Sequence, residues 1–292
     1  MQANDLASEV SGLWNFDDPA VSEQRFRNLL DRVQGDPEAE AVVRTQIARA
    51  EGLQRSFADG HATLDAVERL PAARGARVAV RLALERGRLL NSSQEAVRAR
   101  PFFEAAFARA REAGEEALAV DAAHMIAIVE RDPAAQAQWN EKALALAEVS
   151  SDPLARAWRA SLLNNLGWTR HGEGRFDEAL TLFEKALAAR EERGAAGPIR
   201  VARWCVARCL RSLGRLEEAL AAQRVLEKEI TAAGSLPDGF VFEEIAEGLL
   251  ALGRRDEAKP WFARAHEELA KDPWLAEAEP ERLERLRREA GT

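Results

Sequence analysis

The stretch SLLNNLGWTRHGEGRFDEALTLFEKAL, residues 161–187, joins two runs of helix-forming residues through a glycine. Gly174 predicts the end of a first helix, because glycine readily adopts the left-handed backbone conformation found after a helix C-terminus. Asp177 and Glu178 follow where a second helix would begin, and the helix dipole favours negative charge there. The stretch therefore predicts two helices joined by a tight turn.

This unit recurs along the C-terminal half of the chain. GRFDEAL at 174–180 is followed by GRLEEAL at 214–220 and GRRDEAK at 253–259. Twelve residues before the alanine of each motif stands a small residue, and a large apolar residue precedes it. Small residues let two helices approach closely, while the apolar neighbours fill the seam between them. The small residues are Gly167, Ala207 and Ala246. The pattern predicts a series of helical hairpins.

Upstream the same spacing continues with weaker motifs. ARPFFEAA at 99–106 matches AKPWFARA at 258–265 in its alanine, proline and aromatic positions. Ser92 and Glu95 have the spacing of a capping box for the helix that carries the first of these segments. A further unit turns at Asp132 and Pro133 in place of glycine.

These matches divide the sequence into zones of decreasing clarity. Residues 153–272 contain the best repeats, 74–149 match moderately, and 1–71 form degenerate helix pairs, with 37–71 centred on apolar residues that include Ile47 and Leu53. The charged segment 276–290 predicts a capping helix that faces solvent. No linker rich in serine, glycine and proline interrupts the series, so residues 1–292 are predicted to form one continuous domain.

Within residues 163–187, LNNLG followed by GRFDEAL and FEKAL resembles the tetratricopeptide repeat, in a long variety of about 40 residues. This resemblance implies an all-α, right-handed superhelical solenoid of about six or seven antiparallel helix pairs. It also implies that the first helix of each pair lines a concave groove, which takes up a peptide segment of a partner protein. Proteins of this family are usually adaptors without catalytic activity, so no enzymatic function is expected.

The first helices should present a second stripe beside the packed one. Asn164, Trp168 and His171 recur at helical spacing, about 100° away from the stripe that contains Leu163 and Gly167. Translation by one repeat gives further stripes on the other first helices. They are Trp204, Arg208 and Arg211; Glu243, Glu247 and Leu250; Val120, His124 and Ala127; and Leu84, Arg88 and Asn91.

We expect a peptide-binding site on two of these stripes. Tryptophan side chains offer flat apolar surfaces, and arginines donate hydrogen bonds to the carboxylate of an acidic side chain or of a chain terminus. The resemblance assigns Asn165 to the peptide backbone of the ligand. Alternatively, Arg208 only pairs with Glu243 or Glu247, and Trp168 only braces the neighbouring helix. The expected site residues are Asn164, Asn165, Trp168, His171, Trp204, Arg208 and Arg211.

Composition excludes several other functions. A formal net charge of −8 argues against nucleic acid, which requires a basic surface. No apolar run approaches the roughly 20 residues that span a bilayer, and no secretory signal is visible, so we expect no membrane association and a cytoplasmic protein. His124 and His171 are single histidines one repeat apart, with Asp121 as the one nearby carboxylate, and phosphate-binding and hydrolase motifs are missing. No metal or other cofactor is therefore expected.

Two further functions remain open at this point. A repeat protein of this kind can act as a sensor that responds to a small peptide or metabolite, or it can assemble with copies of itself. Cys205 and Cys209, one helical turn apart, are expected to be reduced and packed.

Overall fold

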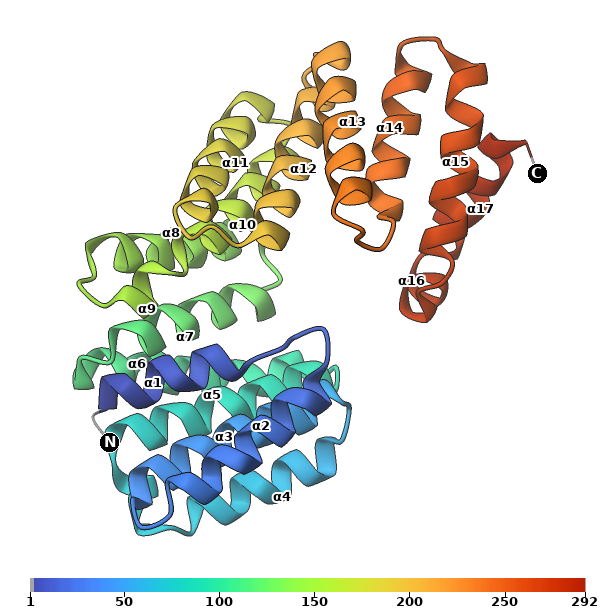
Figure 1. Cartoon of the computed structure of the whole chain (residues 1–292). Helices are drawn as coiled ribbons and strands as arrows, with labels where there is room; N and C mark the ends of the chain where they lie inside the picture. Colours follow the sequence, from blue (N-terminus) through green and yellow to red (C-terminus); the bar gives the residue numbers. More distant parts are fainter. Residues whose placement is uncertain (1–2, 292) are drawn as a thin grey trace. The chain divides into compact units, whose positions relative to one another are not determined.

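The computed structural model describes residues 3–291 and divides the chain into two compact units, Met1–Leu162 and Leu163–Thr292 (Figure 1). In these described residues all regular secondary structure is helical. The boundary falls within α10 (Arg159–Gly172). The single continuous domain expected from the sequence therefore stays a prediction, and each unit has its own core.

The first unit is a series of helix pairs with short connections. Helices that follow one another in the chain pack together, so each hairpin covers the next (Figure 1). The elements are α1 (Ala3–Leu13), α2 (Pro19–Arg32), α3 (Pro37–Leu53), α4 (Phe57–Glu68), the 3-10 helix η1 (Pro71–Arg74), α5 (Ala76–Ser92), α6 (Ala96–Ala113), α7 (Glu116–Val129), α8 (Pro133–Val149) and α9 (Pro153–Arg156).

The second unit contains the clearest repeats and ends in a short helix pair. Gly174, Gly214 and Gly253 follow its first helices with φ values of 75°, 75° and 76°, which confirms the turns predicted from the sequence. The elements after α10 are α11 (Phe176–Glu191), α12 (Ala196–Ser212), α13 (Leu216–Ala232), α14 (Gly239–Ala251), α15 (Arg255–Leu269), α16 (Pro273–Ala278) and α17 (Pro280–Ala290).

The predicted seam between paired helices is present in both units. A Cβ atom added to Gly167 would lie 2.6 Å from the ring of Phe183, and one added to Gly87 would lie 2.4 Å from the ring of Phe103. Both phenylalanines are completely buried. The small residue is therefore required because the aromatic ring of the second helix packs directly on the backbone of the first.

One repeat departs from this pattern. Phe183 follows Gly167 by sixteen residues, and the residue at the same distance from Ala207 is Gln223. Gln223 is 1% exposed, and neither polar atom of its amide has a hydrogen-bond partner among the described residues. A buried amide without partners destabilises a fold, so this position is a weak point of the second unit.

Two local predictions are wrong. Ser92 is the last residue of α5, and Glu95, which precedes α6, makes no capping bond through its side chain. Gln94 takes up a left-handed φ of 66° in this turn, so the segment is a glycine-free version of the usual turn and not a capping box. Leu53, expected in the core, is 44% exposed at the end of α3.

The predicted capping helix is confirmed as α17, an amphipathic helix with one apolar side. Leu283 and Leu286 are buried, and α17 packs against α15. Its remaining faces are charged, as expected for the last helix of a repeat array. This packing brings its arginines to α14, as described below.

Candidate peptide-binding face

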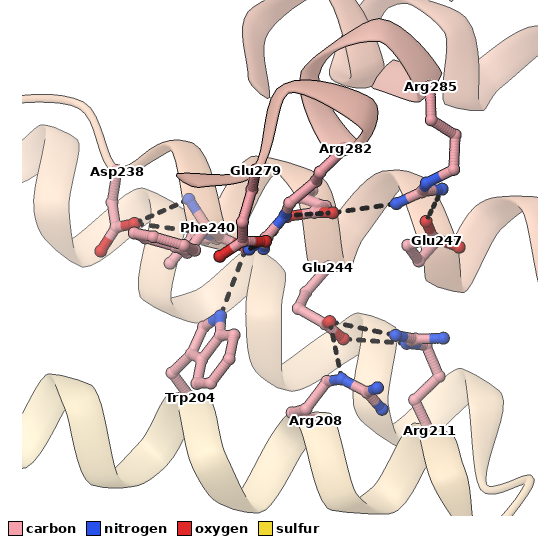
Figure 2. A network of polar contacts seen from close by, with 12 residues as sticks. Trp204, Arg208, Arg211, Asp238, Phe240, Glu244, Glu247, Glu279, Arg282 and Arg285 are labelled. Carbon is pink, nitrogen blue, oxygen red and sulfur yellow. Dashed lines mark hydrogen bonds and ion pairs between the residues drawn. The ribbon is translucent and has the colours of Figure 1, made fainter. Parts of the chain in front are cut away.

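Three aromatic side chains follow one another along the first helices of the second unit. Trp168 lies on α10, Trp204 on α12 and Phe240 on α14, with ring centroids 6.0 Å and 6.4 Å apart. The indole Nε1 of Trp204 donates a hydrogen bond to the carbonyl oxygen of Phe240 at 3.2 Å (Figure 2). We call these three residues the aromatic row. Phe240 was not among the predicted site residues, because it precedes the expected stripe by one helical turn.

The row is partly exposed and partly packed. Phe240 is 41% exposed, while Trp168 is half-buried, with its ring 5.0 Å from that of Phe183 on α11. Trp168 also contacts His171 at 5.2 Å in an edge-to-face arrangement. Trp168 therefore braces its own helix pair and also presents aromatic surface.

The predicted arginines share one carboxylate. Arg208 and Arg211 on α12 contact Glu244 on α14, with Nε to oxygen distances of 3.0 Å and 2.8 Å (Figure 2). Pairing across the repeat was one of the two expected outcomes, but the acceptor is Glu244 and not Glu243 or Glu247. Glu244 follows the predicted stripe position, Glu243, by one residue.

Burial acts differently on the two guanidinium groups. Burial lowers the pKa of Arg208 more than the nearby Glu244 raises it. Burial also opposes the charge of Arg211, but its hydrogen bonds to Glu244 outweigh this and raise its pKa. Arg211 makes two hydrogen bonds to Glu244, at 2.8 Å and 3.0 Å, whereas Arg208 contacts the same carboxylate through Nε.

The other carboxylates of α14 are paired with α17. Arg282 donates from Nε to Glu243 Oε2 at 3.1 Å, and Arg285 donates from Nη2 to Glu243 Oε1 at 3.0 Å. Arg285 also forms an ion pair with Glu247 (Figure 2). The acidic helix α14 therefore lies between arginines from α12 and arginines from α17. We call this arrangement the charge ladder.

His171 joins the ladder through a serine. Its Nε2 lies 2.9 Å from Ser212 Oγ, which also accepts a hydrogen bond from Arg208 Nη1 at 2.7 Å. Burial lowers the pKa of His171, and the positive charges of Arg208 and Arg211 lower it further. The imidazole is therefore neutral at pH 7 and acts as a hydrogen-bonding group.

The two adjacent asparagines have different surroundings. The Sγ of Cys205 donates a hydrogen bond to Asn164 Oδ1 at 3.3 Å, so this amide ties α10 to α12. Asn165 is half-buried on α10, and its main-chain carbonyl oxygen accepts a hydrogen bond from the Thr169 hydroxyl at 3.1 Å. The structure thus brings the seven predicted residues onto adjacent helices, while their role in peptide binding stays a prediction.

A series of helix pairs, in which a small residue of the first helix meets an aromatic ring of the second, is typical of a helical-repeat protein. Residues 137–192 match the family model described as tetratricopeptide repeat, which confirms the resemblance. The chain has the fold of tetratricopeptide-repeat proteins. No curated protein sequence matches the chain.

Solved structures with the same fold are distant in sequence. BtubC from P. vanneervenii is 18% identical with a TM-score of 0.57, and the match covers 82% of this chain and 95% of that one. The apo form of RapI is 10% identical with a TM-score of 0.69, covering 92% and 76%. A Rap protein complexed with competence and sporulation factor is 13% identical with a TM-score of 0.60, covering 92% and 77%. These values show a shared fold.

None of the helices in residues 3–291 is long and apolar enough to cross a membrane. Within the same part of the chain, no group of three or more histidine, cysteine, aspartate and glutamate side chains is placed to hold a metal ion.

Proposed function

We propose that this protein is a non-catalytic interaction scaffold that binds a peptide segment of a partner protein on the aromatic row and the adjacent arginines. The observation that carries the proposal is the juxtaposition of Trp168 and Trp204 with Arg208 on neighbouring first helices. Tryptophan and arginine contribute most of the binding energy in many protein interfaces. The planar guanidinium group of arginine loses less conformational entropy per hydrogen bond formed than a flexible ammonium group.

The charge ladder defines which peptides would suit this face. An acidic side chain or a terminal carboxylate of the ligand would share Arg208 with Glu244, whose carboxylate is 7% exposed and cannot leave easily. Arg208 is 26% exposed and retains donors that can turn towards a ligand. The apolar part of the peptide would lie on the aromatic row, beside Phe240.

Fold-level comparisons support an interaction or regulatory role. Tetratricopeptide-repeat folds are generally interaction scaffolds, and one similar structure is a Rap protein complexed with competence and sporulation factor. A sensor that responds to a bound peptide would use the same face. In that case ligand binding would change the solution scattering of the protein, whereas a static adaptor would show no change. Self-association remains the other candidate, and a mass that rises with concentration would support it.

The proposal is tested by capturing partners from native lysate with the wild type and with the double variant Trp168→Ala, Arg208→Gln. Circular dichroism first establishes that both proteins are equally helical. Trp261→Ala is the matched control. Trp261 lies on α15, the second helix of its pair, where it packs against Phe242 and is not part of the aromatic row. The expected result is a partner that is retained by the wild type and the control but lost by the double variant. Equal retention by all three proteins would disprove binding on this face.

A further inference from the structure

The first-helix face of the first unit carries a second cluster of buried charges. Arg88 on α5 donates from Nη1 to Glu85 at 2.6 Å and forms an ion pair with Asp121 on α7. The three side chains are only 2–11% exposed. Arg88 is thus fully engaged by two carboxylates, and its pKa is raised because these charges and bonds outweigh its burial.

Arg49 on α3 stands beside this cluster without an ion pair of its own among the described residues. Among the described residues no carboxylate lies within ion-pair distance of its guanidinium group. Its Cζ lies instead 5.0 Å from the ring centroid of Trp14 and 5.5 Å from that of Phe16, and these two rings are stacked. The aromatic faces hold the cation in place but do not neutralise it.

The environment of Arg49 makes its charge costly. Burial lowers its pKa to about 10, the positive charge of Arg88 adds to this shift, and the carboxylates of Glu85 and Asp121 oppose it in part. The group nevertheless remains protonated at neutral pH. A desolvated cation without a paired anion is unfavourable, so a bound anion would be favoured there by charge as well as by hydrogen bonding.

A cavity of about 150 Å³ opens between these arginines. Arg49 and Arg88 line it together with the polar side chains of Asn91 and Ser92, and no acidic residue is part of its lining. Apolar walls complete it, and they come from Gly52, Leu53, Leu89 and Met125. An apolar cavity of about this size accommodates a molecule such as benzene.

We propose that this cavity binds a carboxylate attached to a short aliphatic group, with the carboxylate on Arg49 and the aliphatic group against Leu53, Leu89 and Met125. The geometry favours a single negative charge. Glu85 and Asp121 are ion-paired with Arg88, so Arg49 is the cation of the lining that remains without an ion pair, and the second charge of a dianion such as a phosphate monoester would have no partner. The chemistry is shared by two sources, a free short-chain carboxylic acid and the C-terminal residue of a peptide.

This site is independent of the aromatic row, since it is built only from α3, α5 and α7 of the first unit. Two residues of its lining, Arg88 and Asn91, belong to a stripe that the sequence predicts from the repeat spacing. Arg49 is the essential addition, and only the fold places it beside them.

The test is isothermal titration calorimetry of the full chain with four probes. 3-Methylbutanoate represents a free carboxylic acid, and acetyl-Gly-Gly-Leu with a free terminus represents a peptide. Their carboxamide analogues are the uncharged controls. We expect saturable binding of at least one carboxylate, with binding at least 10-fold weaker for its carboxamide. Similar affinities of the two carboxylates indicate the free acid as the ligand class, whereas a peptide preference above 10-fold indicates a chain terminus.

Three variants tie binding to the cavity. Arg49→Gln removes the unpaired cation and should weaken carboxylate binding at least 10-fold. Arg44→Gln is the matched control, because Arg44 lies on the same helix as Arg49, α3, but does not line the cavity; it should change affinity less than twofold. Met125→Trp fills the apolar part, keeps Arg49 and should also abolish binding, which guards against a folding defect in the first variant.

Several results would overturn the proposal. These are no saturable binding of either carboxylate, equal binding of carboxylate and carboxamide, or unchanged binding by both Arg49→Gln and Met125→Trp. None of these results bears on the aromatic row, whose own test uses different residues and a partner protein.

Discussion

The first-helix faces of the two units carry similar side chains in different states of pairing. In the second unit each of Arg208, Arg211 and Arg282 has a carboxylate of α14 within reach. In the first unit Arg88 takes both nearby carboxylates and Arg49 has none among the described residues. A ligand on the second face would therefore share Arg208 with Glu244, whereas the proposed carboxylate on the first face would meet an arginine without an ion pair. Charge composition alone does not reveal this difference.

The largest expected effect is on the reactivity of the two cysteines, both of which lie in the second unit. Both thiols lie on α12 in the second unit, and burial raises the pKa of Cys205 and of Cys209 to about 11. A raised pKa means that the neutral thiol persists, so thiolate appears only as the pH rises towards 11. At pH 8 roughly a thousandth of each thiol is ionised, against about a quarter for an ordinary cysteine.

We therefore expect reaction with a disulfide reagent at pH 8 to be more than ~100-fold slower in the native protein than in the chain unfolded by guanidinium. The rate of release of the coloured thiolate measures this directly. Because both cysteines lie in one unit, the residual native rate reports the opening of the second unit alone. Fast labelling of the native protein would contradict the packing of α12.

The next effect tests what the two units share. Gly87→Ala in the first unit and Gly167→Ala in the second should each lower the free energy of unfolding by about 1–3 kcal/mol, because the new methyl group overlaps a buried phenylalanine. Guanidinium denaturation followed by circular dichroism measures the change. Gly248→Ala is the control within α14, where an added Cβ finds only ordinary contacts at 3.7 Å and 3.8 Å. This variant should be more stable than the wild type by about 0.5–1 kcal/mol. Destabilisation by Gly248→Ala alone would contradict the seam.

A third prediction sharpens the charge comparison. Glu244→Gln leaves Arg208 and Arg211 without their carboxylate and should lower the free energy of unfolding by about 1–2 kcal/mol, since both arginines remain partly hydrated. Glu218→Gln removes a surface partner of Arg215 and should leave the stability unchanged, because both side chains are exposed to solvent. Equal effects of the two variants in thermal unfolding would show that the charge ladder does not stabilise the second unit.

The smallest expected effect is a gain in stability. Gln223→Leu replaces a buried amide without partners by an aliphatic side chain of similar size, and should raise the free energy of unfolding by about 1 kcal/mol. Gln136→Leu is the control. The Nε2 of Gln136 donates a hydrogen bond to the carbonyl oxygen of Ala127 at 3.1 Å, and this bond would be lost, so Gln136→Leu should not raise the stability. If Gln223→Leu instead lowers stability in the same denaturation assay, its amide must have a partner in solution.

Much of the fold follows from patterns within single helices. The glycines after α10, α12 and α14 and the small residue twelve positions before each motif alanine predict where helices end and where they touch. The turn at Gln94 escaped prediction, because a non-glycine residue holds the left-handed position there and its strain is offset by packing of α5 on α6. The exposure of Leu53 was not predicted, because a residue at a helix end faces solvent or core according to where the chain turns.

The candidate site shows the same division. Repeat spacing placed Trp168, Trp204, Arg208 and Arg211 on adjacent helices, and the structure agrees. It did not identify Phe240 in the aromatic row or Glu244 as the shared acceptor. Both depend on how the side chains of α12 and α14 pack against each other, which a uniform translation along the sequence does not record.

By itself the sequence determined that this protein is all-helical, built of repeated hairpins with a charged capping helix, because helix periodicity, turn glycines and small seam residues act over a few residues. Only the tertiary structure decided which charges are neutralised. Partner choice depends on separations of a few ångströms between side chains that are 30 to 40 residues apart in sequence, as for Arg211 and Glu244. A Coulomb interaction in a partly buried site changes strongly over such distances, so Arg49 and Arg208 differ in a way that no local pattern records.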